Sequence, residues 1–568
     1  MKEFKGQIIF LLFFLCALSF FQFEPRFLLS QLSTYIFLVV IGFYGLWIYF
    51  ARPYKELLRR WKIPLITVFI TFMVLSVYSP NLTAQWGVID DHEIMTYLGT
   101  DAKMSFAELP GLFQKSEAFL PGVVLRYRPV YQLFRLFETA LWDDHPQAWY
   151  ATRLVMFIFF LVVVWWATSK IAGDIGGGIF TFFVFSYDFW RDILARLGPS
   201  EAYVVLGLGL FILFFTKIWL VTPKANPSWK SWMGLVLGSL IAIGSKENVM
   251  VLVVPIICLL VWIIAHRRIT KASIVSFCVM ISFTMFVGWA VFSATAKAGH
   301  DVYAQSTQAS NRVQTLLVSI KTHQSKKILT TLGVAGVLFA FTLLKHRDRK
   351  LLTIELTFVA GLLFLLFIFV SQFVFYNGNW PDHNRYDFPG LLFEVGYYLL
   401  GIWYLIQLLQ WLKLPKELTN GVKWGILCGV MALAIMRGLV STLVDVKLNA
   451  QRTQAHTSHI KKVAAQLKEN PEIPFVIESH NVWDYEPVFS TKIFLRAQGV
   501  TNPFYLRLHG YTSKSVSIGL EQQLATQLEE ISLKGNDSYR PLSEFNSTNS
   551  CFSLFLSGET KTECQKIQ

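Results

Sequence analysis

The sequence predicts a mainly α-helical protein that crosses a membrane many times and ends in a small α/β domain. Of its 568 residues, 54% are hydrophobic and only 15% are charged. This is more apolar than a soluble domain of that size can bury. The apolar residues are gathered in blocks of about 17 to 25, the length that crosses roughly 30 Å of hydrocarbon as a helix. The lipid bilayer is therefore the expected partner of most of the chain.

About thirteen of these blocks are expected to be membrane spans. They fall near residues 6–23, 32–50, 63–79, 152–168, 173–188, 202–220, 230–244, 248–265, 272–294, 328–344, 351–375, 388–411 and 423–443. The first lacks a small-residue cleavage site, so it is expected to remain as a span. The short block 173–188 contains the run Gly176 to Gly178, which indicates an irregular helix.

Lysine and arginine are concentrated in the short links between blocks. These basic links are Ala51 to Lys62, Thr222 to Lys230, His266 to Lys271, Lys345 to Lys350 and Gln410 to Lys423. The positive-inside rule places all of them in the cytoplasm. The formal charge of +14 then reflects topology, and no nucleic-acid partner is expected. The N-terminus is predicted to be cytoplasmic, and the long first outer loop is 80–151.

We predict three parts of the chain: a pair of N-terminal spans with a basic link (1–62), a membrane core (63–443) and an extracytoplasmic α/β domain (444–568). In the last part, strands are expected at Pro474 to Glu478, Pro503 to Leu508 and Cys551 to Leu556, and helices at Tyr485 to Ala497 and Leu520 to Leu533. Cys551 and Cys564 are its only cysteines. In an oxidising periplasm they could form a disulfide, and two free thiols are the alternative.

Four polar clusters fall on the predicted outer side. They contain Asp90, Asp91 and Glu93; Gly198, Pro199, Ser200 and Glu201; Ser245, Lys246 and Glu247; and Asp382, His383, Arg385 and Tyr386. The first outer loop adds Arg126 and Arg128. Any one cluster could be a helix cap or an interface anchor. Their coincidence on one face favours a functional site, and buried charges such as Lys246 and Glu247 should have partners.

Such a mixture of charges suits a substrate with an apolar tail and a phosphate head. The tail can lie between spans while arginine and lysine bind the phosphate. A carboxylate opposite them can accept a proton from an attacking hydroxyl. The cations also stabilise the departing phosphate as its negative charge grows.

These residues resemble the class C (GT-C) integral membrane glycosyltransferases, which use polyprenyl-phosphate sugars. The resemblance rests on the early acidic pair, the Gly198-Pro199-Ser200-Glu201 turn, the Ser245-Lys246-Glu247 hairpin and Arg385-Tyr386, and it covers roughly residues 63–411. It implies that Asp90 or Asp91 is the catalytic base of an inverting transfer. It further implies phosphate-binding roles for Arg126, Arg128, Lys246 and Arg385, and pocket roles for Glu93, Glu201, Glu247, Asp382, His383 and Tyr386.

The resemblance implies a bacterial inner-membrane enzyme that glycosylates an envelope glycan or lipid, such as O-antigen or lipopolysaccharide. The cofactor stays open: no zinc-type His/Cys set is evident, and a divalent cation held by Asp90 and Asp91 is one possibility, for which no sequence pattern speaks. One alternative is a polymerase or ligase of lipid-linked oligosaccharides, which tends to lack the early acidic pair. A lipid-linked glycan transporter or flippase is the other, and it normally requires mid-membrane charges or repeated halves.

Overall fold

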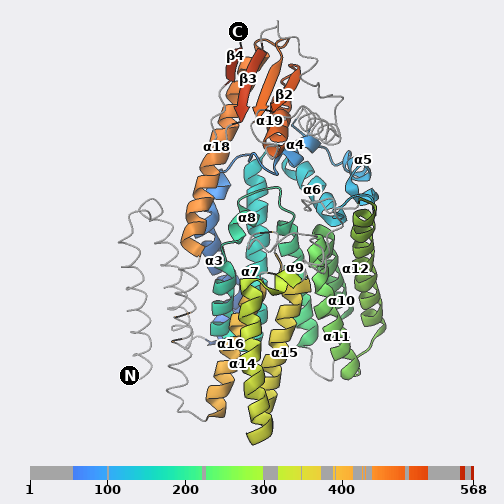
Figure 1. The fold of residues 1–568 in the computed structure, drawn as a ribbon, viewed down its shortest axis with the longest axis vertical. Coiled ribbons are helices and arrows are strands. Elements are labelled where there is room, and N and C mark those ends of the chain that lie inside the picture. The colour runs from blue at the N-terminus through green and yellow to red at the C-terminus, as the bar shows by residue number, and fades with distance from the viewer. Residues whose placement is uncertain are drawn as a thin grey trace.

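The computed structural model describes residues 55–98, 102–220, 226–298, 317–346, 348–371, 388–390, 392–412, 438–479, 485–508, 551–556 and 564–567, together with Arg385, Gly425 and Gly429. This part of the chain is mainly a bundle of long helices. At one end of the bundle, uppermost in Figure 1, lie short helices and a small sheet. We call this the site end.

Seven described helical segments are long and apolar enough to cross a membrane, so the chain is a multi-pass membrane protein. They are Trp61–Thr83, Pro146–Lys170, Glu201–Trp219, Glu247–Ala265, Lys271–Lys297, Ser325–Leu344 and Arg349–Ser371. The predicted spans 6–23 and 32–50, and most of 423–443, lie outside the described residues. The total of thirteen therefore remains a prediction.

The membrane bundle is built from α3 (Lys55–Tyr78), α7 (Pro146–Phe185), α9 (Glu201–Trp219), α10 (Trp229–Ser245), α11 (Val253–Ala265), α12 (Lys271–Ala298), α14 (His323–Phe341), α15 (Arg349–Ser371) and α16 (Leu392–Trp411). Shorter elements connect them: η2 (Ser79–Thr83), α4 (His92–Leu98), α5 (Leu109–Gln114), η3 (Glu117–Phe119), α6 (Pro129–Trp142), α8 (Trp190–Leu194), η4 (Glu247–Leu252) and η5 (Thr342–His346).

Helix α7 contains the predicted span 152–168 and most of the predicted span 173–188. The two are separated by a kink at Gly173, whose φ of 75° and ψ of 175° are non-helical. Glycine adopts such a conformation without the steric cost that a Cβ would bring. The predicted irregularity in this region is confirmed, but the break lies three residues before Gly176.

Helices α9 and α10 pack backbone to backbone through glycines. A Cβ added to Gly207 would lie 2.5 Å from the backbone nitrogen of Ala242, and one added to Gly238 would lie 2.5 Å from that of Phe211. Small residues allow membrane helices to approach this closely. Because α9 begins at Glu201 and α10 ends at Ser245, this antiparallel contact brings Glu201 and Lys246 together at the site end.

Two apolar cores meet at the site end. The larger one joins α3, α7, α8, α9, α10, α11 and α12 and includes Phe388. The second joins residues 84–150 to the C-terminal part, with Trp86, Leu136 and Leu197 packed alongside Leu467 and Phe475. The first outer loop and the C-terminal part are therefore one packed unit.

Helix α18 (Val440–Lys468) runs across the predicted boundary at 443/444 and continues along one side of the molecule to the sheet (Figure 1). Its middle contacts the site end, where the Asn449 side chain donates to the Ala195 carbonyl. The sheet that follows has four strands in the order β2-β1-β3-β4.

The strands are β1 (Phe475–Ser479), β2 (Phe504–Leu508), β3 (Cys551–Leu556) and β4 (Cys564–Ile567), and α19 (Tyr485–Ala497) joins β1 to β2. β1 pairs in parallel with β2 and β3, and β3 pairs antiparallel with β4. The described elements match three predicted strands and one predicted helix, while the predicted helix at Leu520 to Leu533 lies outside the described residues.

Strands β3 and β4 carry the two cysteines of this part of the chain. Cys551 lies opposite Ile567 and Cys564 lies opposite Leu554, so the two cysteines are not paired with each other in the strand register. The disulfide and the two free thiols both stay predictions.

Candidate functional site

The candidate site is the junction of four segments at the site end. They are residues 85–93 of the first outer loop, the turn 197–201 before α9, the α10–η4 corner 246–248, and Arg385 with Phe388. The close packing of α9 and α10 positions two of these segments, and the outer loop folds over them. Each of the four predicted polar clusters thus supplies at least one described residue to the same place.

Asp90 faces Arg385. The Oδ2 atom of Asp90 lies 3.0 Å from Nη1 of Arg385, and the two side chains are 16% and 11% exposed. Asp90 has a φ of 71°, a left-handed conformation that aspartate tolerates better than most residues. It also lies so close to Gly198 that a Cβ on that glycine would be 1.9 Å from the Asp90 Cβ. The glycine is therefore required for Asp90 to occupy this position.

The Asp91 side chain contacts backbone amides and is 1% exposed. Its Oδ1 accepts a hydrogen bond from the Leu197 amide at 3.0 Å, and its Oδ2 accepts one from the Gly87 amide at 2.7 Å. Burial raises the pKa of Asp91 to about 7, although the two amides act to lower it. Because both oxygens are occupied by backbone amides, Asp91 holds the outer loop against the turn and leaves Asp90 facing the charges.

The turn at Leu197 and Gly198 is held by two buried arginines. Arg135 donates to the carbonyls of Leu197 at 2.9 Å and Gly198 at 2.6 Å, and Arg153 donates to Leu197 at 3.4 Å. The hydroxyl oxygen of Tyr131 lies 3.1 Å from the Gly198 carbonyl oxygen and accepts a hydrogen bond from Arg135 at 2.7 Å. These contacts fix the backbone on which Asp90 rests.

Lys246 and Glu201 form a buried ion pair, with Nζ and Oε1 2.9 Å apart and the side chains 1% and 5% exposed. The same ammonium donates to the carbonyls of Arg385 at 2.8 Å and Phe388 at 3.2 Å. Asn248 also donates to the Phe388 carbonyl, at 2.9 Å. The α10–η4 corner therefore holds the backbone of Arg385 in place opposite Asp90.

Arg128 and Glu247 form a second pair with two parallel hydrogen bonds. Nε donates to Oε2 at 2.6 Å and Nη2 donates to Oε1 at 2.8 Å. This two-point geometry is the strongest that a guanidinium and a carboxylate form. The expectation that Lys246 and Glu247 have oppositely charged partners is thus confirmed. Arg126 contributes positive charge near Glu117.

Glu93 is the most open carboxylate of the group, with 50% of its side chain exposed. Its Oε2 accepts a hydrogen bond from the Tyr131 hydroxyl at 2.7 Å and lies 3.9 Å from Arg135. The neighbouring His92 is buried, and burial lowers its pKa. Glu93 therefore connects the structural arginines to the solvent-facing side of the site.

Three predicted site residues, Asp382, His383 and Tyr386, lie outside the described residues. The sequence reasoning also missed residues that hold the site, namely Tyr131, Arg135 and Arg153. Arg153 carried a signal, because it is a charge inside the predicted span 152–168, where an unpaired arginine would be costly. It pairs with the buried Glu138, with Nη2 and Oε2 2.9 Å apart.

Among the residues that the structure describes, no three His, Cys, Asp or Glu side chains are grouped as metal ligands would be. The two carboxylates considered for a divalent cation serve different partners, since Asp90 pairs with Arg385 and Asp91 binds two amides.

The arrangement offers a carboxylate and several guanidinium groups in one partly shielded place. Arg385 is held by backbone contacts that leave its head group to face Asp90. An anionic ligand at Arg385 would compete with Asp90 for the guanidinium, and Asp90 would then be available to accept a proton. A guanidinium group of the kind that binds anions and a carboxylate of the kind that accepts protons thus lie side by side at the end of long apolar helices.

Two solved structures of ArnT from Cupriavidus metallidurans resemble this chain. The structure bound to undecaprenyl phosphate has 12% sequence identity and a TM-score of 0.40, and the apo structure has 13% identity and a TM-score of 0.42. Each comparison covers 87% of this chain and 93% of the ArnT chain. No family model and no curated protein sequence matches the chain. At these values the likeness concerns the fold alone.

Proposed function

We propose that this protein transfers a sugar from a polyprenyl-phosphate donor to a hydroxyl of an envelope glycan or lipid, with Asp90 as the general base. The observation that carries the proposal is the 3.0 Å pair of Asp90 and Arg385, positioned by a buried network at the end of membrane-spanning helices. A lipid-linked phosphate would reach such a place from the bilayer.

In this proposal the donor phosphate binds Arg385 and frees Asp90. The freed carboxylate takes the proton of the acceptor hydroxyl as its oxygen attacks the anomeric carbon, and the bond from that carbon to the phosphate oxygen breaks. Arg385 stabilises the charge that develops on the leaving phosphate. Attack opposite the leaving group inverts the anomeric centre. Arg126 and Arg128, on the same side of the site, are further phosphate candidates.

The roles of the other charged residues follow from their contacts. Lys246 has three described acceptors, which match the three N–H donors of an ammonium. We therefore propose Lys246 and Glu201 as positioning residues for Arg385, in place of a direct contact between Lys246 and phosphate. Asp91 has the same kind of role for Asp90, and Glu247 positions Arg128.

We further propose that the site end faces the periplasm of a bacterial inner membrane, with the N-terminus in the cytoplasm. The positive links between the helices support this orientation. An O-antigen, a lipopolysaccharide or another envelope glycan is the acceptor class that this location offers.

The test compares envelope glycans by mass spectrometry in a deletion strain complemented with wild type, Asp90→Asn or Asp174→Asn. Asp174 pairs with Lys62, near the start of α3 and away from the site end, and is the matched control. We expect one sugar to be missing in the deletion and Asp90→Asn strains and present in the other two. If the Asp90→Asn strain glycosylates as the wild type does, Asp90 is not the general base.

Purified protein in lipid nanodiscs separates this function from the alternatives. A transferase converts a polyprenyl-phosphate sugar and an acceptor to product on one side of the membrane, whereas a transporter only moves the lipid from one side to the other. A polymerase or ligase would move whole oligosaccharides and would not depend on Asp90.

A further inference from the structure

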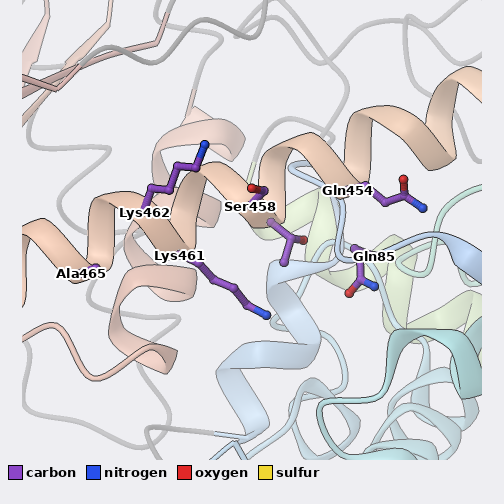
Figure 2. A pocket seen from close by; sticks show the side chains of 7 residues that line it. Gln85, Gln454, Ser458, Lys461, Lys462 and Ala465 are labelled. Atoms are coloured by element: carbon purple, nitrogen blue, oxygen red, sulfur yellow. The ribbon is translucent and has the colours of Figure 1, made fainter.

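An open pocket of about 560 Å³ lies outside the Asp90 site, between α18 and the start of the first outer loop. It is lined by Gln85, Gln454, Thr457, Ser458, Lys461, Lys462 and Ala465. Six of these seven residues belong to α18, in two rows with helical i, i+4 spacing: 454, 458 and 462, and 457, 461 and 465. Figure 2 shows the two lysines leaving the helix in different directions, Lys461 toward the side on which Gln85 lies.

The pocket is positively charged and rich in hydrogen-bonding groups. Both lysines are exposed, and neither forms an ion pair with another residue of the described part of the chain. Lys461 interacts electrostatically with the Asp144 carboxylate, which accepts a hydrogen bond from the Trp86 indole at 2.6 Å. Amides, a hydroxyl and two ammonium groups are what an anionic saccharide requires of a binding site.

The pocket is connected to the Asp90 site through its own lining. The backbone amide of Gln85 donates to the Thr453 hydroxyl at 3.0 Å, and the side-chain amide of Gln454 donates to the Thr83 carbonyl at 2.7 Å. Two residues after Gln85, the Gly87 amide binds Asp91. One short segment therefore forms both the floor of the pocket and the support of the candidate base.

The pocket lies further along α18 than the candidate site, and so further from the membrane-spanning helices. Asn449 contacts the turn at Ala195, level with the candidate site. The pocket residues 454–465 follow 5 to 16 positions later, which at about 1.5 Å per residue is roughly 8 to 24 Å further from the spans. A polyprenyl phosphate held at the membrane surface would not reach it, but a long acceptor glycan would.

We propose that this pocket binds a phosphorylated saccharide of the acceptor, and so holds the acceptor while another of its hydroxyls reaches Asp90. The proposal rests on the proposed transferase function and adds to it the charge of the acceptor. Lys461, which extends toward the side of Gln85, binds the phosphate, Lys462 adds positive charge to the pocket, and Ser458 and the two glutamines bind sugar hydroxyls.

Calorimetric titration of the full-length protein in nanodiscs tests this directly. The probes are glucose 6-phosphate, glucose and inorganic phosphate. We expect glucose 6-phosphate to bind more tightly than either other probe. The Lys461→Ala/Lys462→Ala variant should weaken its binding by about 2- to 25-fold, since each of the two exposed charges is worth up to about fivefold. Lys468→Ala, an exposed lysine on the same helix outside the pocket, is the matched control and should bind as wild type does.

Equal binding to wild type and the double lysine variant, or no binding of glucose 6-phosphate to wild type at millimolar concentration, would overturn the proposal. Inorganic phosphate that binds as tightly as glucose 6-phosphate would overturn the saccharide part of it. Asp90→Asn should bind the probe normally, because it leaves the pocket intact. If Asp90→Asn transfers sugar normally while the lysines still bind the probe, the transferase mechanism fails and the pocket stands.

Discussion

Replacing Gly198 with alanine should displace Asp90. The new Cβ would lie 1.9 Å from the Cβ of Asp90 and 2.9 Å from its Cα, whereas ordinary contacts are 3.4–4 Å. One of the two backbones must therefore move by about 1.5 Å or more. The turn cannot easily do so, because the buried Arg135 holds the Gly198 carbonyl at 2.6 Å. We expect Asp90 to move away from Arg385.

A displacement of about 1 Å at a catalytic group can cost about 100-fold in rate. We therefore expect Gly198→Ala to lower kcat for sugar transfer by about 100-fold or more. Overpacking of this kind destabilises a fold by about 1 to 3 kcal/mol. The assay measures transfer by purified protein in nanodiscs, and thermal unfolding of the same samples measures the cost to stability.

Gly111→Ala is the matched control, since a Cβ there meets nothing within 4 Å. It should retain wild-type transfer and stability. If Gly198→Ala unfolds like wild type and also transfers sugar at the wild-type rate, the close approach does not position Asp90 and the reasoning is wrong. Loss of transfer in the folded variant supports it.

Three further predictions concern the supporting network. Lys246→Met should destabilise the folded protein by about 3 to 5 kcal/mol, because it leaves Glu201 buried without a partner. The double variant Lys246→Met/Glu201→Met should recover most of this stability in thermal unfolding. A double variant that is no more stable than Lys246→Met would contradict the prediction. Because the pKa of Asp91 is raised to about 7, its protonated form is favoured in the folded state. Stability should fall by on the order of 4 kcal/mol from about pH 4 to pH 7, and Asp91→Asn should remove this slope in unfolding at several pH values. A lysine in place of Arg128 cannot form both hydrogen bonds to Glu247, so Arg128→Lys should lower the free energy of unfolding by about 1.5 to 3 kcal/mol. Unfolding identical to that of wild type would contradict this.

The α9–α10 contact illustrates how far sequence patterns reach. Apolar blocks and basic links predicted the spans that include Glu201–Trp219 and Lys271–Lys297 to within a few residues, because the bilayer imposes a length and a polarity on each helix independently of its neighbours. The same reasoning identified Gly198 and Glu201 as a turn before a span.

Pairing within the site could not be predicted, because it depends on which helix ends lie next to each other. Lys246 was recognised as a charge that needs a partner, but nothing in the sequence joins it to Glu201, which lies 45 positions away. The boundary at 443/444 was placed on a change in composition, whereas α18 continues through it because one face of the helix packs on the site end.

The sequence by itself determined that this is a multi-pass membrane protein with acidic and basic clusters at helix ends, since hydrophobic length and charge are local properties. Only the tertiary structure distinguished Asp90 from Asp91. The two are adjacent and chemically identical, but the left-handed backbone at Asp90 turns one carboxylate to Arg385 and the other to the amides of Gly87 and Leu197. Two of those contacts, with Leu197 and Arg385, come from segments more than 100 residues away, so the sequence around the two aspartates does not reveal them.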